Sequence, residues 1–242
     1  MTAPPHRAAA FYDAGTGTGG VRDWITLLHP PYTVWHLSYV AIGAAVAGHL
    51  VLWRLGGTLL AFFLAVGIGA HALDELHGRP LNTGISSRGL VVAAVLSIGA
   101  AMVAGLLYGG LRLLPFVAVG GLFAVGYNLE ILGGVLHNDF GFALTWGAFP
   151  VLVGAYAQHW TLPAPVFVAA AAALLISLGQ RSLSTAARTL RRKAARVSVT
   201  ITWKDGSQRQ LGRADLLAPL ERALRVFAWA LGALAVALVL AR

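Results

Sequence analysis

Seven long apolar runs constrain the fold of this 242-residue chain more than any other feature of its sequence. A helix needs about 20 mostly apolar residues to cross the hydrocarbon core of a bilayer. Runs near this length cover residues 32–53, 57–76, 89–110, 112–130, 140–158, 163–180 and 219–241. They are continuous rather than alternating, which favours helices over the strands of a membrane barrel. The sequence therefore predicts an all-α, polytopic membrane protein with about seven transmembrane helices.

Composition supports this class and excludes others. Only 11% of the residues are charged, whereas soluble domains carry roughly 25%. The absence of cysteine excludes disulfides, thiolate metal sites and a cysteine nucleophile. A net charge of +9 would suit nucleic-acid binding, but the basic residues concentrate in segment 181–225, between the last two apolar runs. The positive-inside rule explains such a cluster, so we expect no nucleic-acid partner.

The same rule predicts the topology. With segment 181–225 in the cytoplasm, the amino terminus is also cytoplasmic, and the expected location is the plasma membrane of a prokaryotic cell. We expect residues 1–28 to be a flexible or interfacial segment, with a short interfacial helix at Val21–Leu28. Residues 29–242 would form a single transmembrane domain.

A basic cytoplasmic loop, 181–218, is the largest extramembrane part of that domain. The apolar and polar residues of Val197–Trp203 alternate, Lys204–Gly206 is typical of a turn, and Ser207–Leu211 can pair back on the first run. The sequence therefore predicts a small hairpin at 197–211, between the sixth and seventh helices.

Two clusters of ionisable side chains lie at the ends of apolar runs, on the side predicted to be cytoplasmic. Charged groups at membrane depth are costly, and they usually face a cavity and have a function. On a helix, His71, Asp74 and Glu75 share one face, because their spacings are three and four residues. We predict a divalent-metal site there, with Asp74 and Glu130 as the catalytic carboxylates. The predicted metal ligands are His71, Asp74, Glu75, His77, Glu130 and His137.

The ligand types leave the metal open. Imidazole nitrogens together with carboxylate oxygens suit zinc, iron or manganese, whereas an oxygen-only set favours magnesium. The alternative for Asp74 and Glu75 is structural: they could pair with an arginine or a histidine and hold the loops together. Arg79 could bind an anionic headgroup through its two parallel donors, and we assign it to substrate binding with His29 and Asn128.

Three stretches resemble the UbiA-type intramembrane prenyltransferase superfamily. Residues 29–35 begin with His-Pro and end with a tryptophan, which is similar to the family's opening Arg-Pro segment. Asp74 followed by Arg-Pro-Leu-Asn-Thr-Gly-Ile-Ser at 79–86 is similar to its first aspartate motif and the sequence after it. Residues 127–150 are similar to its middle region. The resemblance covers residues 29–180.

The resemblance implies a UbiA-like helical bundle whose enzyme activity depends on magnesium. The chain also departs from the family pattern. The first motif, Asn-x-x-x-Asp-x-x-x-Asp, falls on Ala70, Asp74 and Gly78, so only its middle position is kept. The second aspartate pair falls near 180–184, where there is no carboxylate. The family has nine spans rather than seven.

Three functions follow as hypotheses. The first is a divergent UbiA-like, prenyltransferase-like enzyme that acts on an isoprenoid or lipid with a divalent metal at a cytoplasmic polar pocket. The second is a hydrolase or oxidoreductase that acts on a lipid through a histidine and carboxylate metal site. The third is a non-enzymatic lipid-binding or structural membrane protein.

Overall fold

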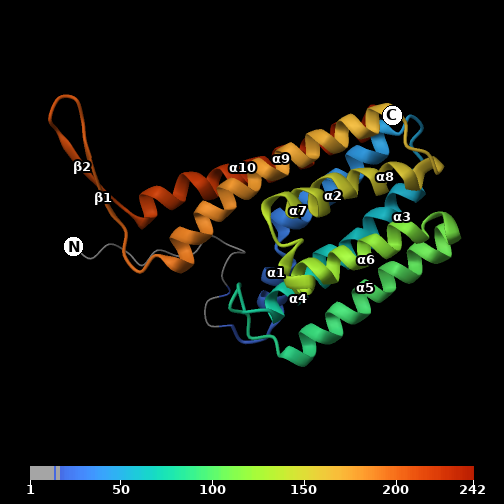
Figure 1. Ribbon diagram of the computed structural model, residues 1–242, viewed down its shortest axis with the longest axis horizontal. Helices are drawn as coiled ribbons and strands as arrows, with labels where there is room; N and C mark the ends of the chain where they lie inside the picture. The colour runs from blue at the N-terminus through green and yellow to red at the C-terminus, as the bar shows by residue number, and fades with distance from the viewer. Residues whose placement is uncertain (1–13, 15–16) are drawn as a thin grey trace.

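The computed structural model describes Ala14 and residues 17–242, which form a bundle of long helices lying side by side (Figure 1). Residues 1–13 and 15–16 of the predicted flexible segment lie outside the described residues. The helix expected at Val21–Leu28 is present as α1.

Most of the described chain is helical, with one pair of strands near its carboxyl end. Three segments, η1, η4 and η5, are π-helical, and η2 and η3 are short 3₁₀ helices. In chain order the elements are α1 (Val21–Leu28), α2 (Pro30–Val46), α3 (Leu52–Phe62), η1 (Phe63–Ala70), α4 (His71–Leu76), α5 (Ser87–Gly109), η2 (Gly110–Arg112), α6 (Leu114–Asn128), η3 (Ile131–Gly134), α7 (Asp139–Ala143), η4 (Leu144–Ala148), α8 (Phe149–His159), α9 (Ala164–Arg188), η5 (Thr189–Lys193), β1 (Ser198–Thr202), β2 (Gln208–Gly212) and α10 (Arg213–Leu240).

Five helices of the described chain are long and apolar enough to cross a membrane, so the chain is an integral membrane protein. They run over Leu52–Leu76, Ser87–Arg112, Asp139–His159, Ala164–Lys193 and Arg213–Leu240.

The prediction of about seven spans was therefore wrong. The runs at 32–53 and 112–130 form shorter helices: α2 has 17 residues and α6 has 15. Apolar turns account for the difference. The chain leaves α2 through Gly48, whose φ is +104°, and residues 49–51 of the apolar run are not helical. Hydropathy counts such turn residues as if they belonged to the helix.

The core depends on a close approach between α2 and α8. A Cβ added at Gly43 would lie 2.1 Å from the carbonyl oxygen of Val151, and one added at Gly154 would lie 2.2 Å from that of Val40. Small residues of this kind let the backbones of membrane helices touch. The contact fixes α2 in the middle of the bundle, where α10 also packs against it.

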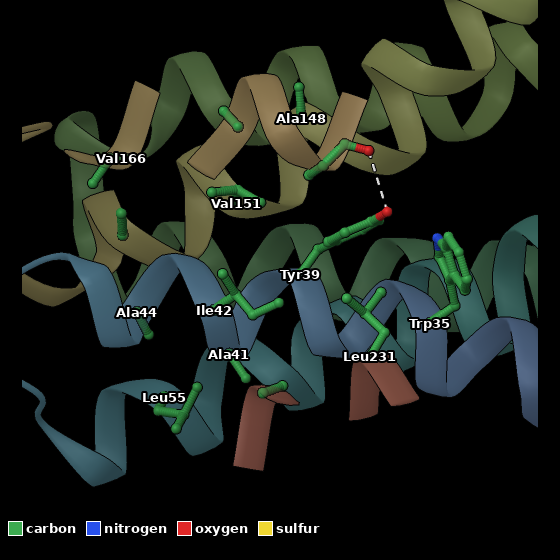
Figure 2. Close-up of a cluster of buried hydrophobic side chains, with 14 of the residues drawn as sticks. Trp35, Tyr39, Ala41, Ile42, Ala44, Leu55, Ala148, Val151, Val166 and Leu231 are labelled. Carbon is green, nitrogen blue, oxygen red and sulfur yellow. Dashed lines mark hydrogen bonds between the residues drawn. The ribbon is translucent and has the colours of Figure 1, made fainter. Parts of the chain in front are cut away.

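Tyr39 of α2 joins this core to α9. Its hydroxyl donates to the carbonyl oxygen of Ala173 at 3.2 Å and lies 3.0 Å from the Ser177 hydroxyl. Figure 2 shows the Tyr39 side chain extending from α2 among alanine, valine and leucine side chains. A buried phenol needs such partners, because a lost hydrogen bond is costly in an apolar core.

The predicted hairpin is confirmed. Strands β1 and β2 pair antiparallel, with Val199 opposite Leu211 and Ile201 opposite Arg209. Figure 1 shows the hairpin turned away from the axes of α9 and α10 and reaching beyond the bundle. We call this end of the molecule the hairpin end.

Candidate functional site

A polar cavity of about 150 Å³ lies near the hairpin end, where α2, α4, α6 and the last turns of α9 meet. Its charged and titratable lining is strongly basic, with four arginines, four histidines and one carboxylate among the described residues. These residues are Arg181, Arg188, Arg191, Arg192, His29, His36, His71, His137 and Asp74. We call this space the basic cavity.

The three π-helical segments all contribute to the cavity wall. Segment η1 supplies Val66, η4 supplies Trp146, and η5 supplies Arg191 and Arg192. π-helical turns are uncommon, and proteins use them frequently at functional sites because they change where side chains face. Their convergence marks this cavity as the candidate site of the described chain.

Asp74 is the carboxylate of the basic cavity. Its side chain is exposed to the cavity space rather than packed. It interacts electrostatically with Arg192 and Arg188, but no arginine nitrogen of the described residues lies within 4.0 Å of it. Asp74 therefore sits among positive charges without a direct ion pair, which leaves its oxygens accessible to a ligand.

Two of the arginines are held by carboxylates at the cavity rim. Arg181 Nε donates to Asp139 Oδ1 at 3.1 Å, and its guanidinium lies 5.1 Å from the ring centre of Phe142. Arg191 pairs with the buried Glu221 of α10. These contacts orient two guanidinium groups beside the cavity without neutralising its overall charge.

Three histidines are oriented by backbone carbonyl groups. Nδ1 of His36 lies 3.0 Å from the Trp146 carbonyl oxygen, that of His71 lies 3.1 Å from the Gly67 oxygen, and that of His137 lies 3.2 Å from the Tyr127 oxygen. A carbonyl oxygen only accepts, so each Nδ1 carries the proton. The other ring nitrogen, Nε2, is then an acceptor whenever the ring is neutral.

His29 lies between α1 and α2 and lines the basic cavity. It is buried, with φ of +45°, and its ring centre lies 5.9 Å from that of His71. Burial, together with the neighbouring His71, lowers the pKa of His29 to about 3. The ring is therefore neutral at pH 7.

Tyr127 adds a polar group to the wall of the basic cavity. Its ring stacks on that of His137, with 4.7 Å between the centres, and its hydroxyl is buried without a hydrogen-bond partner among the described residues. Buried hydroxyl groups almost always have a partner. The Tyr127 hydroxyl on the cavity wall is therefore available to donate to a molecule in the cavity.

A larger apolar groove, of about 340 Å³, lies beside the basic cavity. The two spaces share Val66 and Trp146 in their walls. The groove runs between α3, α5, α6 and α8 and is lined mainly by small apolar and aromatic side chains, including Phe116 and Phe149. A polar compartment thus adjoins an apolar one within the membrane-spanning part.

Glu75 does not belong to this site. The side chain is fully buried, and its carboxylate accepts hydrogen bonds from the backbone N–H groups of Leu81 and Thr83 and from the Thr83 hydroxyl, each at 2.8 Å. Because these bonds occupy both oxygens, Glu75 holds the turn at residues 77–86 instead of facing the cavity. Glu75 therefore holds a loop, as the structural alternative expected, but through Leu81 and Thr83 rather than through an arginine or a histidine.

Arg79 also belongs to that turn. Its guanidinium donates to the Ile85 carbonyl oxygen at 2.5 Å and to the Ser87 hydroxyl at 2.9 Å, and it does not line the basic cavity. Of the residues assigned to substrate binding, His29 and Asn128 line the cavity. The Asn128 side chain donates to the Ala124 carbonyl oxygen at 2.7 Å.

The predicted metal ligands do not assemble into one group. His71, Asp74 and His137 line the basic cavity, whereas Glu75, His77 and Glu130 do not. Glu130 lies 3.8 Å from His137 but is half exposed in the loop before η3. Among the described residues no three histidine, aspartate or glutamate side chains come close enough to hold a metal ion. These residues therefore do not form a preassembled cage of three such ligands, and a divalent metal stays a prediction.

Sequence reasoning missed the arginines, because positive-inside anchoring already explained them. Their spacing carries a signal. Arg181, Arg188 and Arg191 are seven and three residues apart, which puts them on one face of a helix. Asp23 was missed as well. It is buried in α1, and its Oδ2 accepts from the N–H groups of Gly19 and Gly84.

In comparisons with protein-family models, curated proteins and solved structures, the chain has no significant match. The resemblance to the UbiA-type superfamily stays a prediction from residues 29–180. The function is therefore inferred from the geometry of the basic cavity and the apolar groove.

Proposed function

We propose that this protein is a membrane enzyme that acts on an isoprenoid or other lipid whose head carries a phosphate or diphosphate. The observation that carries the proposal is the junction of the two spaces at Val66 and Trp146, basic on one side and apolar on the other. An amphiphile of this kind matches both compartments at once. On the predicted topology the head binds on the cytoplasmic side of the membrane.

The head group is inferred from charge. Arg181 and Arg191 are paired with Asp139 and Glu221, which leaves Arg188 and Arg192 against Asp74 and gives the cavity a positive balance that suits an anion. Guanidinium groups bind phosphate with two parallel donors, and Arg188 and Arg192 have no carboxylate within 4.0 Å among the described residues. The hydroxyl of Tyr127 would supply a further donor.

The tail is inferred from the groove. Its volume of about 340 Å³ and its apolar walls suit a hydrocarbon chain. Aromatic side chains such as Phe123 and Phe149, whose ring centres are 5.1 Å apart, would pack against an unsaturated or branched chain. A soluble phosphate would leave this groove without a role, which is why a lipid is favoured.

The chemistry is assigned to Asp74. In the proposed reaction it accepts a proton from water or from an acceptor hydroxyl. The oxygen of that molecule forms a bond to the lipid carbon that carries the head, and the C–O bond to the phosphate or diphosphate breaks, so that this group departs with the bonding electrons. The arginines offset the negative charge that develops on the leaving group. A divalent ion stays a prediction, which metal analysis of protein purified without chelators would test.

The test is binding and turnover by the purified protein in detergent. Prenyl phosphates, prenyl diphosphates and phosphatidic acid are compared with the matching uncharged alcohols, and release of phosphate is followed. We expect the phosphorylated lipids to bind and the alcohols to bind far more weakly. Arg192→Gln should weaken binding by about 10- to 100-fold, since a charged hydrogen bond contributes about 1.5–3 kcal/mol.

Arg222→Gln is the matched control, because Arg222 is an exposed arginine of α10 that does not line the cavity. Equal losses in the two variants would mean that overall charge, not the cavity, attracts the lipid. If the lipids bind tightly but none of them releases phosphate, the protein binds lipids and the proposed enzyme activity is wrong.

A further inference from the structure

The hairpin formed by β1 and β2 has two different faces, and nothing proposed above uses it. Along each strand alternate side chains point to opposite faces. The pairing puts Val199 and Leu211 on one face and Thr200 and Gln210 on the other. Ile201 follows on the first face, so this ribbon is apolar on one side and polar on the other.

The apolar face is left open. Val199 is 40% exposed and Trp203, which follows β1, is 51% exposed. Every residue of the two strands is exposed except Ile201, Leu211 and Gly212, which are half-buried. Two-stranded hairpins are only marginally stable in water, and an exposed apolar patch usually marks a contact surface.

The base of the hairpin is nevertheless fixed to the bundle. Arg213, at the start of α10, donates to the carbonyl oxygens of Ala194 and Ala195 on the opposite leg. At the other end Asp205 accepts from the N–H and hydroxyl groups of Ser207, which closes the turn. The ribbon is therefore held at a defined position rather than left as a loose loop.

Charge indicates what covers the apolar face. Residues 196–213 contain four basic side chains, Arg196, Lys204, Arg209 and Arg213, and one acidic side chain, Asp205. Arg209 lies opposite Ile201, beside the apolar side chains. Apolar side chains flanked by lysine and arginine, with a tryptophan at the edge, suit the headgroup region of an anionic bilayer.

We propose that the hairpin is a membrane-surface anchor that lays its apolar face, Val199, Ile201, Trp203 and Leu211, on anionic lipid headgroups beside the bundle. Figure 1 shows the hairpin at one end of α9 and α10, turned away from their axes, and in the proposed arrangement it lies along the headgroups of the leaflet at that end. This anchor does not depend on what the basic cavity binds.

The absence of cysteine from the chain makes a direct test available. Ile201→Cys puts a label on the apolar face, and Thr200→Cys puts the same label on the polar face of the same strand. Each labelled protein carries an environment-sensitive fluorophore and is reconstituted in nanodiscs of phosphatidylcholine, with or without phosphatidylglycerol. Lipids with a spin label near the headgroup serve as quenchers.

We expect quenching and a blue shift at position 201, but not at position 200, in the anionic nanodiscs. Adding Lys204→Gln and Arg209→Gln to Ile201→Cys should weaken the contact by about fivefold for each charge removed, because a basic residue near an anionic surface contributes about 1 kcal/mol. Equal quenching at both positions, or none at either, would overturn the proposal. A change at position 201 that an acidic peptide causes in detergent, without quenching in anionic nanodiscs, would identify a protein partner instead and would overturn it as well.

Discussion

Two adjacent carboxylates of the short helix α4 have different surroundings, one in the turn at residues 77–86 and the other in the basic cavity. Glu75 faces the turn, is fully buried and accepts three hydrogen bonds. Asp74 faces the cavity, is exposed to it and has no arginine nitrogen of the described residues within 4.0 Å. Neighbouring residues on a helix point in directions about 100° apart, so sequence proximity does not imply a shared role.

This difference shows how a structural carboxylate can be distinguished from a functional one in a cluster of ionisable side chains. A carboxylate whose oxygens are filled by backbone N–H groups stabilises the fold and has nothing left for a ligand. A carboxylate that faces open space among arginines adds little stability and keeps its oxygens accessible. Substitution of Glu75 should therefore lower the stability of the protein, whereas substitution of Asp74 should lower its turnover.

Glu75→Ala should produce the largest effect, a loss of about 4 kcal/mol of stability, because it leaves buried donors of Leu81 and Thr83 without partners. The measurement is thermal or denaturant unfolding in detergent. Thr83→Val is the graded control, since it removes only the hydroxyl bond and should cost about 1 kcal/mol. Equal, small losses in both variants would contradict the structural role of Glu75.

Asp74→Asn should lower turnover by about 100-fold, a typical effect of losing a general base, while unfolding stays within about 1 kcal/mol of the parent. The amide keeps the size of the side chain but cannot accept the proton. Phosphate release and unfolding are measured on the same preparation. A large loss of stability with this variant would give Asp74 a structural role like that of Glu75 and would remove the contrast between the two carboxylates.

His29 tests the cavity side through pH. Its folded-state pKa of about 3 lies below the value near 6.5 expected for an unfolded chain. As the pH falls below about 6.5 the unfolded chain takes up the proton first, so stability falls by about 1.4 kcal/mol per pH unit until the folded pKa is reached. Above about 6.5 this contribution is constant.

The check compares the parent with His29→Gln. Between about pH 6.5 and pH 5 the parent should lose about 2 kcal/mol more than the variant, measured by unfolding in detergent. Parallel pH profiles would mean that His29 is not buried as a neutral base.

Sequence reasoning could predict the parts of the molecule that local pattern determines. Continuous apolar runs indicated membrane helices, and alternation indicated the hairpin at 197–211, because both patterns follow from the geometry of a single element. The number of spans was wrong because apolar turns, such as the one through Gly48, have the same hydropathy as helices.

The site was predicted only in part for a different reason. Polar residues at helix ends indicated a cavity near His71, Asp74 and His137, and these do line it. The Glu75 carboxylate accepts hydrogen bonds from backbone N–H groups because the turn at 77–86 folds back over it. No local sequence pattern predicts that contact. The arginines of α9 and η5 were assigned to anchoring because their partner surface comes from other helices.

Arg79→Gln gives the smallest expected effect and the sharpest contrast with Arg192→Gln. Arg79 donates to the Ile85 carbonyl oxygen and the Ser87 hydroxyl, so the substitution should cost about 1 kcal/mol of stability and leave lipid affinity unchanged. Arg192→Gln should do the reverse, because Arg192 is exposed and lines the cavity. Both variants remove one positive charge, so a general charge effect would weaken lipid binding equally in the two. If only Arg79→Gln lowers lipid affinity, the headgroup binds at the turn that contains Arg79, as the sequence analysis predicted. The binding site would then not be the basic cavity.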